Sequence, residues 1–485
     1  KRTYVKNVRF EGQISGDTQS DYTKHLGDVG GIGYFIGPFV DVEQAIVTNS
    51  TLYAYRDAGG LFGIMDHGGK IHRSGAEVHI TTDGNKTQTN IGGLVGYLDI
   101  ANNNINAKEN YTTYITQSYA KGAIDKADEN VGGFIGQLYA YNVDNDISLE
   151  NNYTTVNITS RYYNDRESFT SYYDNKKTDT NNPTQGLGGF IGRVLISTDN
   201  DSYDPVLTIR RNYVGGNLRY YNGITNNSYG GYANSGFIGY YYGGYSNYDD
   251  IEFEQVDNYW DLSRMHFEPT FNNEGLHYGG SSWPSDYDDG VDGKTRNQLQ
   301  EQTTFINYDF DATWVMDKTG LRNYGYPRLQ WEVEADDTPN TIPFAGSGTG
   351  AEPYLIESLD DFIAFGELAY KYDNAHFKLT TDLDMSQSQF WDRSDDDGDG
   401  NRYNDPNDAT DAGSNNGWLP IGNLIFGNAE LDSWFHGHFD GGGHTIDGLH
   451  QRTEDRFYGG LFGYMKVADG DSASIKNLHL TNGNF

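Results

Sequence analysis

The residues best suited to chemistry in this chain form one short acidic run, Asp395-Asp-Asp-Gly-Asp-Gly-Asn401. Three carboxylates stand at alternate positions, a glycine permits a sharp turn, and an asparagine follows that can offer its backbone carbonyl. Calcium takes about six to eight oxygen ligands, and loops of this spacing supply them. We therefore expect a bound Ca²⁺ whose first ligands are Asp395, Asp397, Asp399 and Asn401.

The closing ligand of this loop departs from the common calcium pattern. Position 12 is Pro406 where a bidentate Glu is usual, so Asp405 or Asp408 has to complete the shell. A solvated acidic loop is the alternative, but carboxylates this close repel one another without a cation. The pattern therefore favours calcium.

Two other groupings could carry chemistry, and both are weaker. His436, His438 and His444 lie close in sequence, but no cysteine or carboxylate spacing supports a transition-metal site. Asp382 and Asp384 imitate the paired carboxylates of a glycosidase, yet an acidic chain contains many such pairs. We expect a chain without enzymatic activity.

A four-residue motif recurs along the chain and indicates its secondary structure: Gly, two bulky apolar residues, Gly (the repeated word). Six copies begin at Gly60, Gly93, Gly133, Gly189, Gly236 and Gly460. A fixed word with spacers of variable length is typical of repeat proteins, with insertions looping out of a constant scaffold. We expect one apolar residue of each word to point into a shared core: Leu61, Leu94, Phe134, Phe190, Phe237 and Leu461.

The segments between the words alternate apolar and polar residues, as half-buried strands do. Examples are Val5–Phe10, Glu77–Thr82 and Tyr153–Thr159. An Asn-Tyr step recurs at Asn152, Asn212 and Asn258, and asparagine tolerates left-handed backbone and can hydrogen-bond along a stack. The sequence thus predicts an all-β fold, a right-handed β-solenoid (β-helix) with variable loop insertions and one short helix near 358–371, with Ser358 as its N-cap.

Composition limits the class of protein further. The 485 residues include 61 glycines and 39 tyrosines, no cysteine, and a formal net charge of −35. Such an acidic chain is a poor partner for nucleic acid, which needs clustered Lys and Arg. No run of about 18 apolar residues exists, so we expect no membrane insertion in this segment. The charge favours solubility in salt and repulsion between neighbouring molecules.

Several further motifs carry a family resemblance. They are Gly346-Ser-Gly-Thr349, Pro353–Ile356, Phe377-Lys-Leu-Thr-Thr-Asp-Leu-Asp384, Trp418-Leu-Pro-Ile-Gly422, Phe435-His-Gly-His-Phe-Asp-Gly-Gly-Gly-His-Thr-Ile446, Tyr259-Trp-Asp261 and Tyr326–Trp331. Together with the repeated word, they resemble bacterial extracellular, adhesin-type surface proteins built from GLUG-motif repeats. The resemblance covers nearly the whole chain.

The order of these motifs is rotated relative to one GLUG module, because the closing motifs precede the opening ones. We therefore expect residues 1–257 to be the GLUG-repeat back part of one module, and 258–335 to be its closing segment. A linker at 336–350 follows, rich in Pro, Gly, Ser and Thr. Residues 351–485 are then the front part of a second module, carrying the acidic calcium-type loop.

The resemblance implies a structural or adhesive segment of a large bacterial surface or filament-forming protein, located outside the cell and involved in biofilm. Host or environmental glycans are possible ligands of its tyrosine-rich spacers. A carbohydrate-active β-helix enzyme and a glycan- or ice-binding module are the alternatives. A cleft with two carboxylates and a base would favour the enzyme, and a flat regular Thr array would favour ice binding.

The two ends of the sequence share one word, apolar-Lys-Asn-apolar. It occurs as Val5-Lys-Asn-Val8 and as Ile475-Lys-Asn-Leu478, not far before Phe485. Exposed strand edges invite pairing. We therefore expect copies of this segment to meet end to end, in a tandem chain or a filament, through ends that include Val5, Val8, Leu478 and Phe485.

Overall fold

The computed structural model describes most of the chain between residues 3 and 484. The described residues are 3–16, 28–82, 90–100, 112–127, 130–141, 146–160, 186–197, 206–219, 233–243, 252–262, 265–266, 276–278, 290–319, 322–333, 344–372, 374–391, 417–418, 420–422, 434–451, 459–465 and 472–484.

The chain forms two compact units. The first covers Lys1–Lys294 together with Phe305–Tyr308, and the second contains Thr295–Thr304 and the described residues from Asp309 onward. Each unit has its own apolar core, so each is described by itself.

Three sheets build the first unit. The six-stranded sheet holds β2 (Val29–Gly30), β5 (Ala58–Gly59), β9 (Asn90–Gly92), β13 (Asn130–Gly132), β17 (Gly186–Gly188) and β22 (Ala233–Ser235). The seven-stranded sheet holds β3 (Gly33–Ile36), β6 (Phe62–Asp66), β10 (Val95–Asp99), β14 (Ile135–Tyr141), β18 (Ile191–Ser197), β23 (Ile238–Gly243) and β27 (Leu276–Tyr278).

The third and largest sheet has fifteen strands. They are β1 (Thr3–Ser15), β4 (Val40–Ala54), β7 (Lys70–His72), β8 (Gly75–Thr82), β11 (Thr113–Thr116), β12 (Tyr119–Ala127), β15 (Ile147–Glu150), β16 (Tyr153–Ser160), β19 (Val206–Arg210), β20 (Tyr213–Val214), β21 (Leu218–Arg219), β24 (Glu252–Val256), β25 (Asn258–Asp261), β26 (Met265–His266) and β28 (Val291–Lys294).

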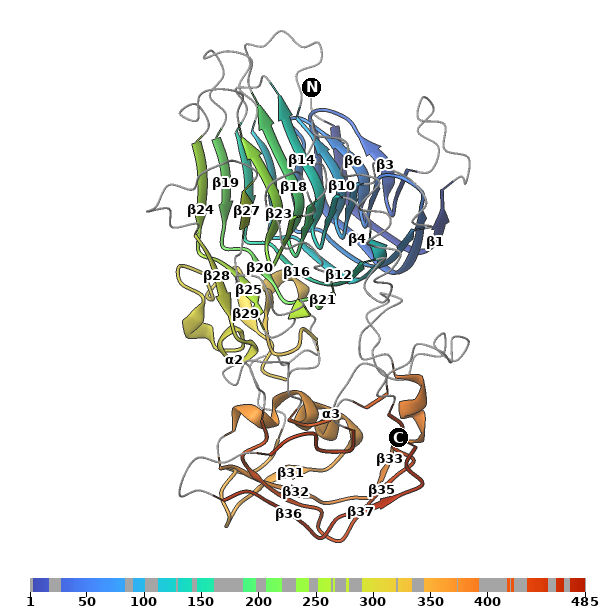
Figure 1. Ribbon diagram of the computed structural model, residues 1–485, viewed down its shortest axis with the longest axis vertical. Helices are drawn as coiled ribbons and strands as arrows, with labels where there is room; N and C mark the ends of the chain where they lie inside the picture. The colour runs from blue at the N-terminus through green and yellow to red at the C-terminus, as the bar shows by residue number, and fades with distance from the viewer. Residues whose placement is uncertain are drawn as a thin grey trace. The chain divides into compact units, whose positions relative to one another are not determined.

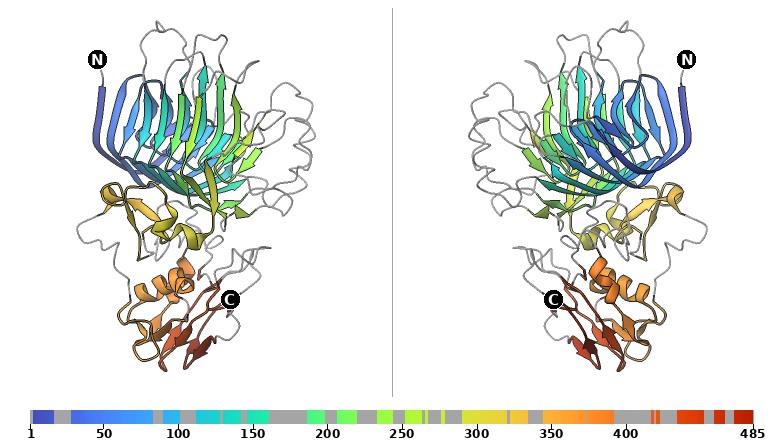
Figure 2. Two further views of the ribbon diagram at one scale, coloured as in Figure 1. Left: turned by 90° about the vertical axis from the view of Figure 1, so that its left-hand side faces the viewer. Right: turned by 90° about the vertical axis from the view of Figure 1, so that its right-hand side faces the viewer.

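Strands in these sheets pair in parallel and in the order of the chain. The six-stranded sheet runs β2-β5-β9-β13-β17-β22, and its neighbours in the seven-stranded sheet follow the same sequence of repeats. Figures 1 and 2 show the strands of the first unit lying side by side in chain order. Each repeat, defined here as the segment from one strand of the six-stranded sheet to the next, therefore adds one strand to each of the two smaller sheets.

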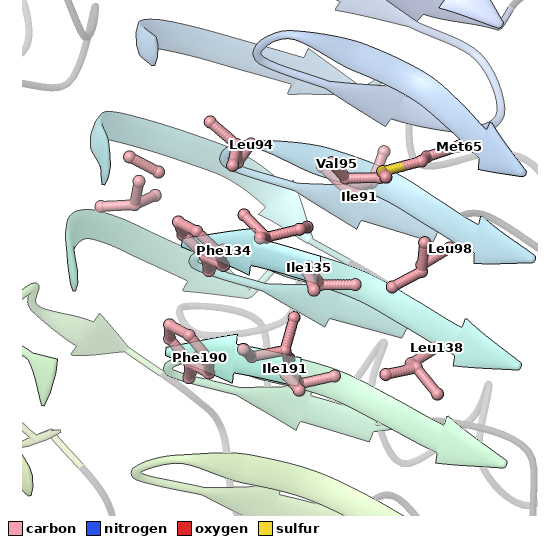
Figure 3. Close-up of a cluster of buried hydrophobic side chains, with 14 of the residues drawn as sticks. Met65, Ile91, Leu94, Val95, Leu98, Phe134, Ile135, Leu138, Phe190 and Ile191 are labelled. Atoms are coloured by element: carbon pink, nitrogen blue, oxygen red, sulfur yellow. The ribbon is translucent and has the colours of Figure 1, made fainter. Parts of the chain in front are cut away.

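The repeated word explains the core of this unit. Its apolar residues follow one another from repeat to repeat, as Figure 3 shows for Leu94, Phe134 and Phe190 and for the neighbouring column Val95, Ile135 and Ile191. A residue that recurs at the same place in each repeat contacts the equivalent residue of the next repeat, so side chains of similar type pack on one another. The described residues of the first unit are almost entirely β-strand and turn, in agreement with the all-β part of the predicted fold class.

The second unit combines small sheets with short helices, as far as its described residues show. Its strands are β29 (Trp314–Met316), β30 (Pro327–Leu329), β31 (Tyr354–Ile356), β32 (His376–Leu379), β33 (Leu383–Asp384), β34 (His438–Asp440), β35 (Thr445–Asp447), β36 (Ser474–Lys476) and β37 (His479–Thr481). Its helices are α2 (Arg296–Leu299), η2 (Gln302–Thr304), η3 (Gln330–Glu332), α3 (Leu359–Leu368), η4 (Ala369–Lys371) and η5 (Ser386–Phe390).

The predicted helix is α3, which continues into η4. Ser358 is its N-cap: the Ser358 Oγ accepts a hydrogen bond from the Asp361 amide at 3.1 Å. Its buried face includes Phe362, which stacks on Trp418, and Phe365, which stacks on Phe439. Among the described helices, none is long and apolar enough to cross a membrane.

Candidate functional sites

The predicted calcium ligands cannot be placed. Asp395, Asp397, Asp399, Asn401, Asp405 and Asp408 all lie outside the described residues. Within the described ranges, no group of three or more His, Asp or Glu side chains is arranged to hold a metal ion. The calcium site stays a prediction from sequence.

The weaker chemical groupings have other partners. The His438 ring stacks on His376 with centroids 4.1 Å apart, and its Nδ1 lies 2.9 Å from the Ser474 hydroxyl. His444 contacts the Asp382 carboxylate at 3.1 Å, which also accepts the Thr445 amide. Asp382, His438 and His444 are therefore engaged in contacts between neighbouring strands and turns.

The residues predicted for the repeat core are all buried. Leu61, Leu94, Phe134, Phe190 and Phe237 have no exposed surface, and Leu461 is 4% exposed. The rings of Phe134, Phe190 and Phe237 form one continuous stack, with centroids 4.8 Å and 4.9 Å apart. Leu461 belongs to the separate core of the second unit, so it does not extend this column.

The glycines of the word allow the repeats to approach closely. A Cβ added at Gly93 would lie 2.2 Å from the Gly133 carbonyl oxygen, and one at Gly133 would lie 2.3 Å from that of Gly189. No side chain fits at such distances. The word therefore needs glycine for contact between neighbouring backbones.

A second regular feature is a line of left-handed residues in the largest sheet. One such residue interrupts the strands of every repeat, with φ between +47° and +56°: Asn7, Gln44, Arg73, Gln117, Asn151, Arg211 and Asp257. The prediction placed this conformation on the asparagine of the Asn-Tyr step. The structure places it one residue earlier, where the side chain can point away from the core.

The asparagines of the Asn-Tyr steps instead line a buried column. The backbone N–H of Asn152 donates to the Asn212 Oδ1 at 2.9 Å, and that of Asn212 donates to the Asn258 Oδ1 at 3.0 Å. Each side-chain amide also donates to the carbonyl of a preceding strand, such as Asn212 to Leu149 at 2.8 Å. The predicted hydrogen bonding along a stack is confirmed at these three residues.

A further polar column was missed by the sequence reasoning. The Asp28 Oδ1 accepts the Asp57 amide at 3.2 Å, and the Asp57 Oδ1 accepts both the amide and the side chain of Asn90, at 3.1 Å and 2.7 Å. The Asn90 Oδ1 in turn accepts from Asn130 at 2.9 Å. The signal was present: each of these four residues stands two positions before a Gly-Gly pair.

Two carboxylates of this column lie close together and out of water. Asp28 is 9% exposed and Asp57 is 4% exposed, and Arg56 approaches both, with its Nε 3.6 Å from Asp28 and an Nη 3.9 Å from Asp57. Burial and the neighbouring Asp28 raise the pKa of Asp57 to about 7, against the opposing effects of Arg56 and Asn90. The carboxyl group can therefore hold a proton in the folded protein near neutral pH.

This raised pKa predicts a dependence of stability on pH. Between pH 4 and 7 the folded state binds a proton at Asp57 that the unfolded state has released, so the free energy of unfolding falls as pH rises through this window. Asp57→Asn keeps an oxygen acceptor for Asn90 and cannot titrate. We expect the free energy of unfolding of this variant, measured relative to the parent, to be roughly 3 kcal/mol higher at pH 8 than at pH 4. Chemical denaturation at both pH values measures it.

The exposed Asp146 provides the matched control. Asp146→Asn also removes one carboxylate, and its stability should keep the pH profile of the parent. An Asp57→Asn variant that lost as much stability at pH 8 as at pH 4 would show that Asp57 is needed in its ionised form.

The residues predicted to form assembly ends lie on strand edges. Val5 and Val8 are half-buried in β1, and Leu478 is half-buried between β36 and β37. Phe485 lies outside the described residues.

Comparison with known proteins gives one partial similarity. A segment of 161 residues, 32% of this chain, is 31% identical to Halomucin of Haloquadratum walsbyi and covers 1% of that protein. This chain thus spans only a small fraction of the length of that relative. No protein-family model matches the sequence, and no solved structure matches it.

Proposed function

We propose that this chain is a non-enzymatic structural segment of a long surface protein outside the cell, and that its first unit is a β-solenoid of GLUG-type repeats. The observation that carries this proposal is the parallel pairing of successive repeats, strand by strand, in three sheets. In such an architecture each repeat contacts its neighbours only, so length is gained by adding repeats. A structure of this kind is suited to spanning distance.

The interior of the first unit supports a structural role. Polar side chains that recur at the same place in successive repeats, such as Asn212 and Asp57, are buried and accept hydrogen bonds from the backbone of adjacent repeats. Their hydrogen bonds join each repeat to the next. The polar residues that recur along the chain are therefore explained by holding repeats in register.

The partial similarity to Halomucin is compatible with this proposal. A match of 161 residues makes up only 1% of that protein, so Halomucin is itself a very long chain. The net charge of −35 also fits a surface protein, since like charges keep neighbouring molecules apart and soluble. Adhesion through the tyrosine-rich spacers, with glycans as ligands, is the part of the proposal that rests on sequence alone.

Surface labelling tests the location. An antibody against the first unit should bind intact cells that carry this protein, and brief treatment of those cells with protease should remove the signal. Labelling that appears only after the cells are lysed would contradict the proposal. An antibody against a cytoplasmic protein of the same cells serves as the control.

We also propose that this chain binds one calcium ion. Its ligands are Asp395, Asp397, Asp399 and the backbone carbonyl of Asn401. Asp405 or Asp408 completes the coordination shell. Removal of calcium by a chelator should lower the melting temperature by several degrees, because a cation bound only by the folded state stabilises it. Added Ca²⁺ should restore the parent value.

The double variant Asp397→Asn and Asp399→Asn is the matched control for the chelator. Its melting temperature should no longer respond to calcium, while its β-sheet circular dichroism remains that of the parent. A parent protein whose melting temperature is unchanged by chelator and by added Ca²⁺ has no functional site at this loop.

A further inference from the structure

The second unit contains chain from both sides of the predicted linker at 336–350. One part, called the docking segment here, is formed by the described residues of 295–304 and 309–333. The other, called the opening part, is formed by the described residues from Phe344 onward and includes α3 and η4. The end of one predicted module and the beginning of the next therefore meet within a single compact unit.

The docking segment has buried residues of its own. Trp314, Tyr326 and Leu329 have no exposed surface, and Trp314 lies opposite Leu329 in the antiparallel pair of β29 and β30. The apolar core of the opening part is made of other residues, from Phe344 to Leu461. The two parts are therefore packed separately, so the contacts that join them form an interface.

A buried ion pair lies in this interface. Arg296, the first residue of α2, donates from an Nη to the Glu367 carboxylate of α3 at 2.6 Å. Glu367 is only 2% exposed, and the Arg296 side chain is 19% exposed. An ionised carboxylate is costly away from water unless a cation pairs with it, and Arg296 supplies that cation from the other part.

A second cation joins the same two parts four residues further along the chain. The Lys371 ammonium in η4 donates to the Gln300 backbone carbonyl at 2.9 Å and lies 3.4 Å from the Glu301 carboxylate. Burial lowers the pKa of Lys371, and the nearby Glu301 opposes this effect. Gln300 is held in turn, because its side-chain amide donates to the Tyr324 carbonyl at 2.6 Å. Lys371 therefore binds a carbonyl that the docking segment fixes in place.

The charges on the two sides of the interface are complementary. The docking segment offers a cation and then an anion, Arg296 and Glu301, whereas the opening part offers an anion and then a cation, Glu367 and Lys371. The chain has 34 Lys and Arg residues against 69 Asp and Glu residues, so surfaces that meet by chance mostly repel. Opposite charges at both places favour a specific interface.

We infer that the docking segment is a recognition site for the opening helix, α3 with η4, of the module that follows it in the chain. This inference rests on the proposed function as a long modular surface protein, and it adds how one module is joined to the next. A linker rich in Gly, Ser and Thr is flexible by itself. The contact, and not the linker, therefore fixes the boundary between modules, and the Arg296–Glu367 pair and Lys371 select the partner.

Cleavage of the linker tests this joint in the folded chain. A recognition sequence for a specific protease, inserted after Asp337, allows the chain to be cut once it has folded. The two pieces of the cut parent should elute together in size-exclusion chromatography. Glu367→Gln should weaken their association by at least about tenfold, because Arg296 is left without its buried anion. Asp360→Asn removes an exposed carboxylate from the same helix and should leave the association unchanged.

Exchange of the two charges tests the pair itself. Arg296→Glu should separate the cut pieces, and its combination with Glu367→Arg should restore their common elution. Circular dichroism of each uncut variant checks that the chain is folded. Pieces of the cut parent that elute separately, or equal effects of Glu367→Gln and Asp360→Asn, would overturn the inference. Neither result bears on surface labelling of intact cells, so failure here is distinguishable from failure of the proposed function.

Discussion

Replacing Phe134 by Asp should destabilise the first unit by about 3 kcal/mol or more. Phe134 has no exposed surface, and its ring stacks on Phe190 at 4.8 Å in the column shared by successive repeats. The substitution buries a carboxylate with no cation beside it and also leaves a cavity. Urea denaturation followed by circular dichroism measures the loss.

Phe134→Leu is the control for this substitution. Leu94 holds the equivalent place in the preceding repeat, so leucine is compatible with the site and should cost roughly 1 kcal/mol. If the Phe134→Asp variant is about as stable as the parent and its Asp side chain is exposed, this column is not the core of the unit.

Gly133→Ala should be nearly as damaging, although it adds a single methyl group. The new Cβ would lie 2.3 Å from the Gly189 carbonyl oxygen and 3.0 Å from the Thr154 Oγ1. Both neighbours are fixed, since Thr154 donates to the Gly133 carbonyl and the Gly133 amide donates to Gly189. The repeats have to move apart, and we expect a loss of about 3 kcal/mol in chemical denaturation.

Gly33→Ala separates this effect from the general cost of changing glycine. Gly33 lies in β3, and the nearest atoms to an added Cβ are those of the Phe62 ring at 4.0 Å. Its stability should stay within about 0.5 kcal/mol of the parent. Equal losses at both positions would show that backbone contact between repeats is not the reason for glycine in the word.

The sequence allowed the strands and the buried word to be predicted because their signals are local. Alternation marks strands such as β16, and the word recurs with the same residue types at each copy. The helix at Ser358 was equally visible through its cap and its acidic first turn. These features depend on neighbours in sequence, or on repetition that can be counted.

Other features depend on contacts between repeats, which sequence order does not reveal directly. The left-handed position falls on Gln44, Arg73 and Arg211 as well as on asparagine, so residue type alone does not locate it. The buried Asp57 became evident only when its hydrogen bonds to the neighbouring repeat were seen. Leu461 carries the same word as the others, yet belongs to another core.

Deletion of one complete repeat tests the central claim most directly. Ile100 and Ala140 hold equivalent places, because Asp99 pairs with Tyr139 and the Ile100 amide donates to the Tyr139 carbonyl. Removing residues 101–140 therefore joins Ile100 to Tyr141 in register. Removing only Tyr119–Gly132 deletes fewer residues. It removes β12 from the fifteen-stranded sheet and β13 from the six-stranded sheet, and it leaves the seven-stranded sheet intact.

If the first unit is a stack of equivalent repeats, the longer deletion should retain β-sheet circular dichroism and cooperative unfolding, because neighbouring repeats can dock on one another in its place. The shorter deletion should lose both. A chain that unfolds after removal of the complete repeat, or one that tolerates the two deletions equally well, would contradict the account.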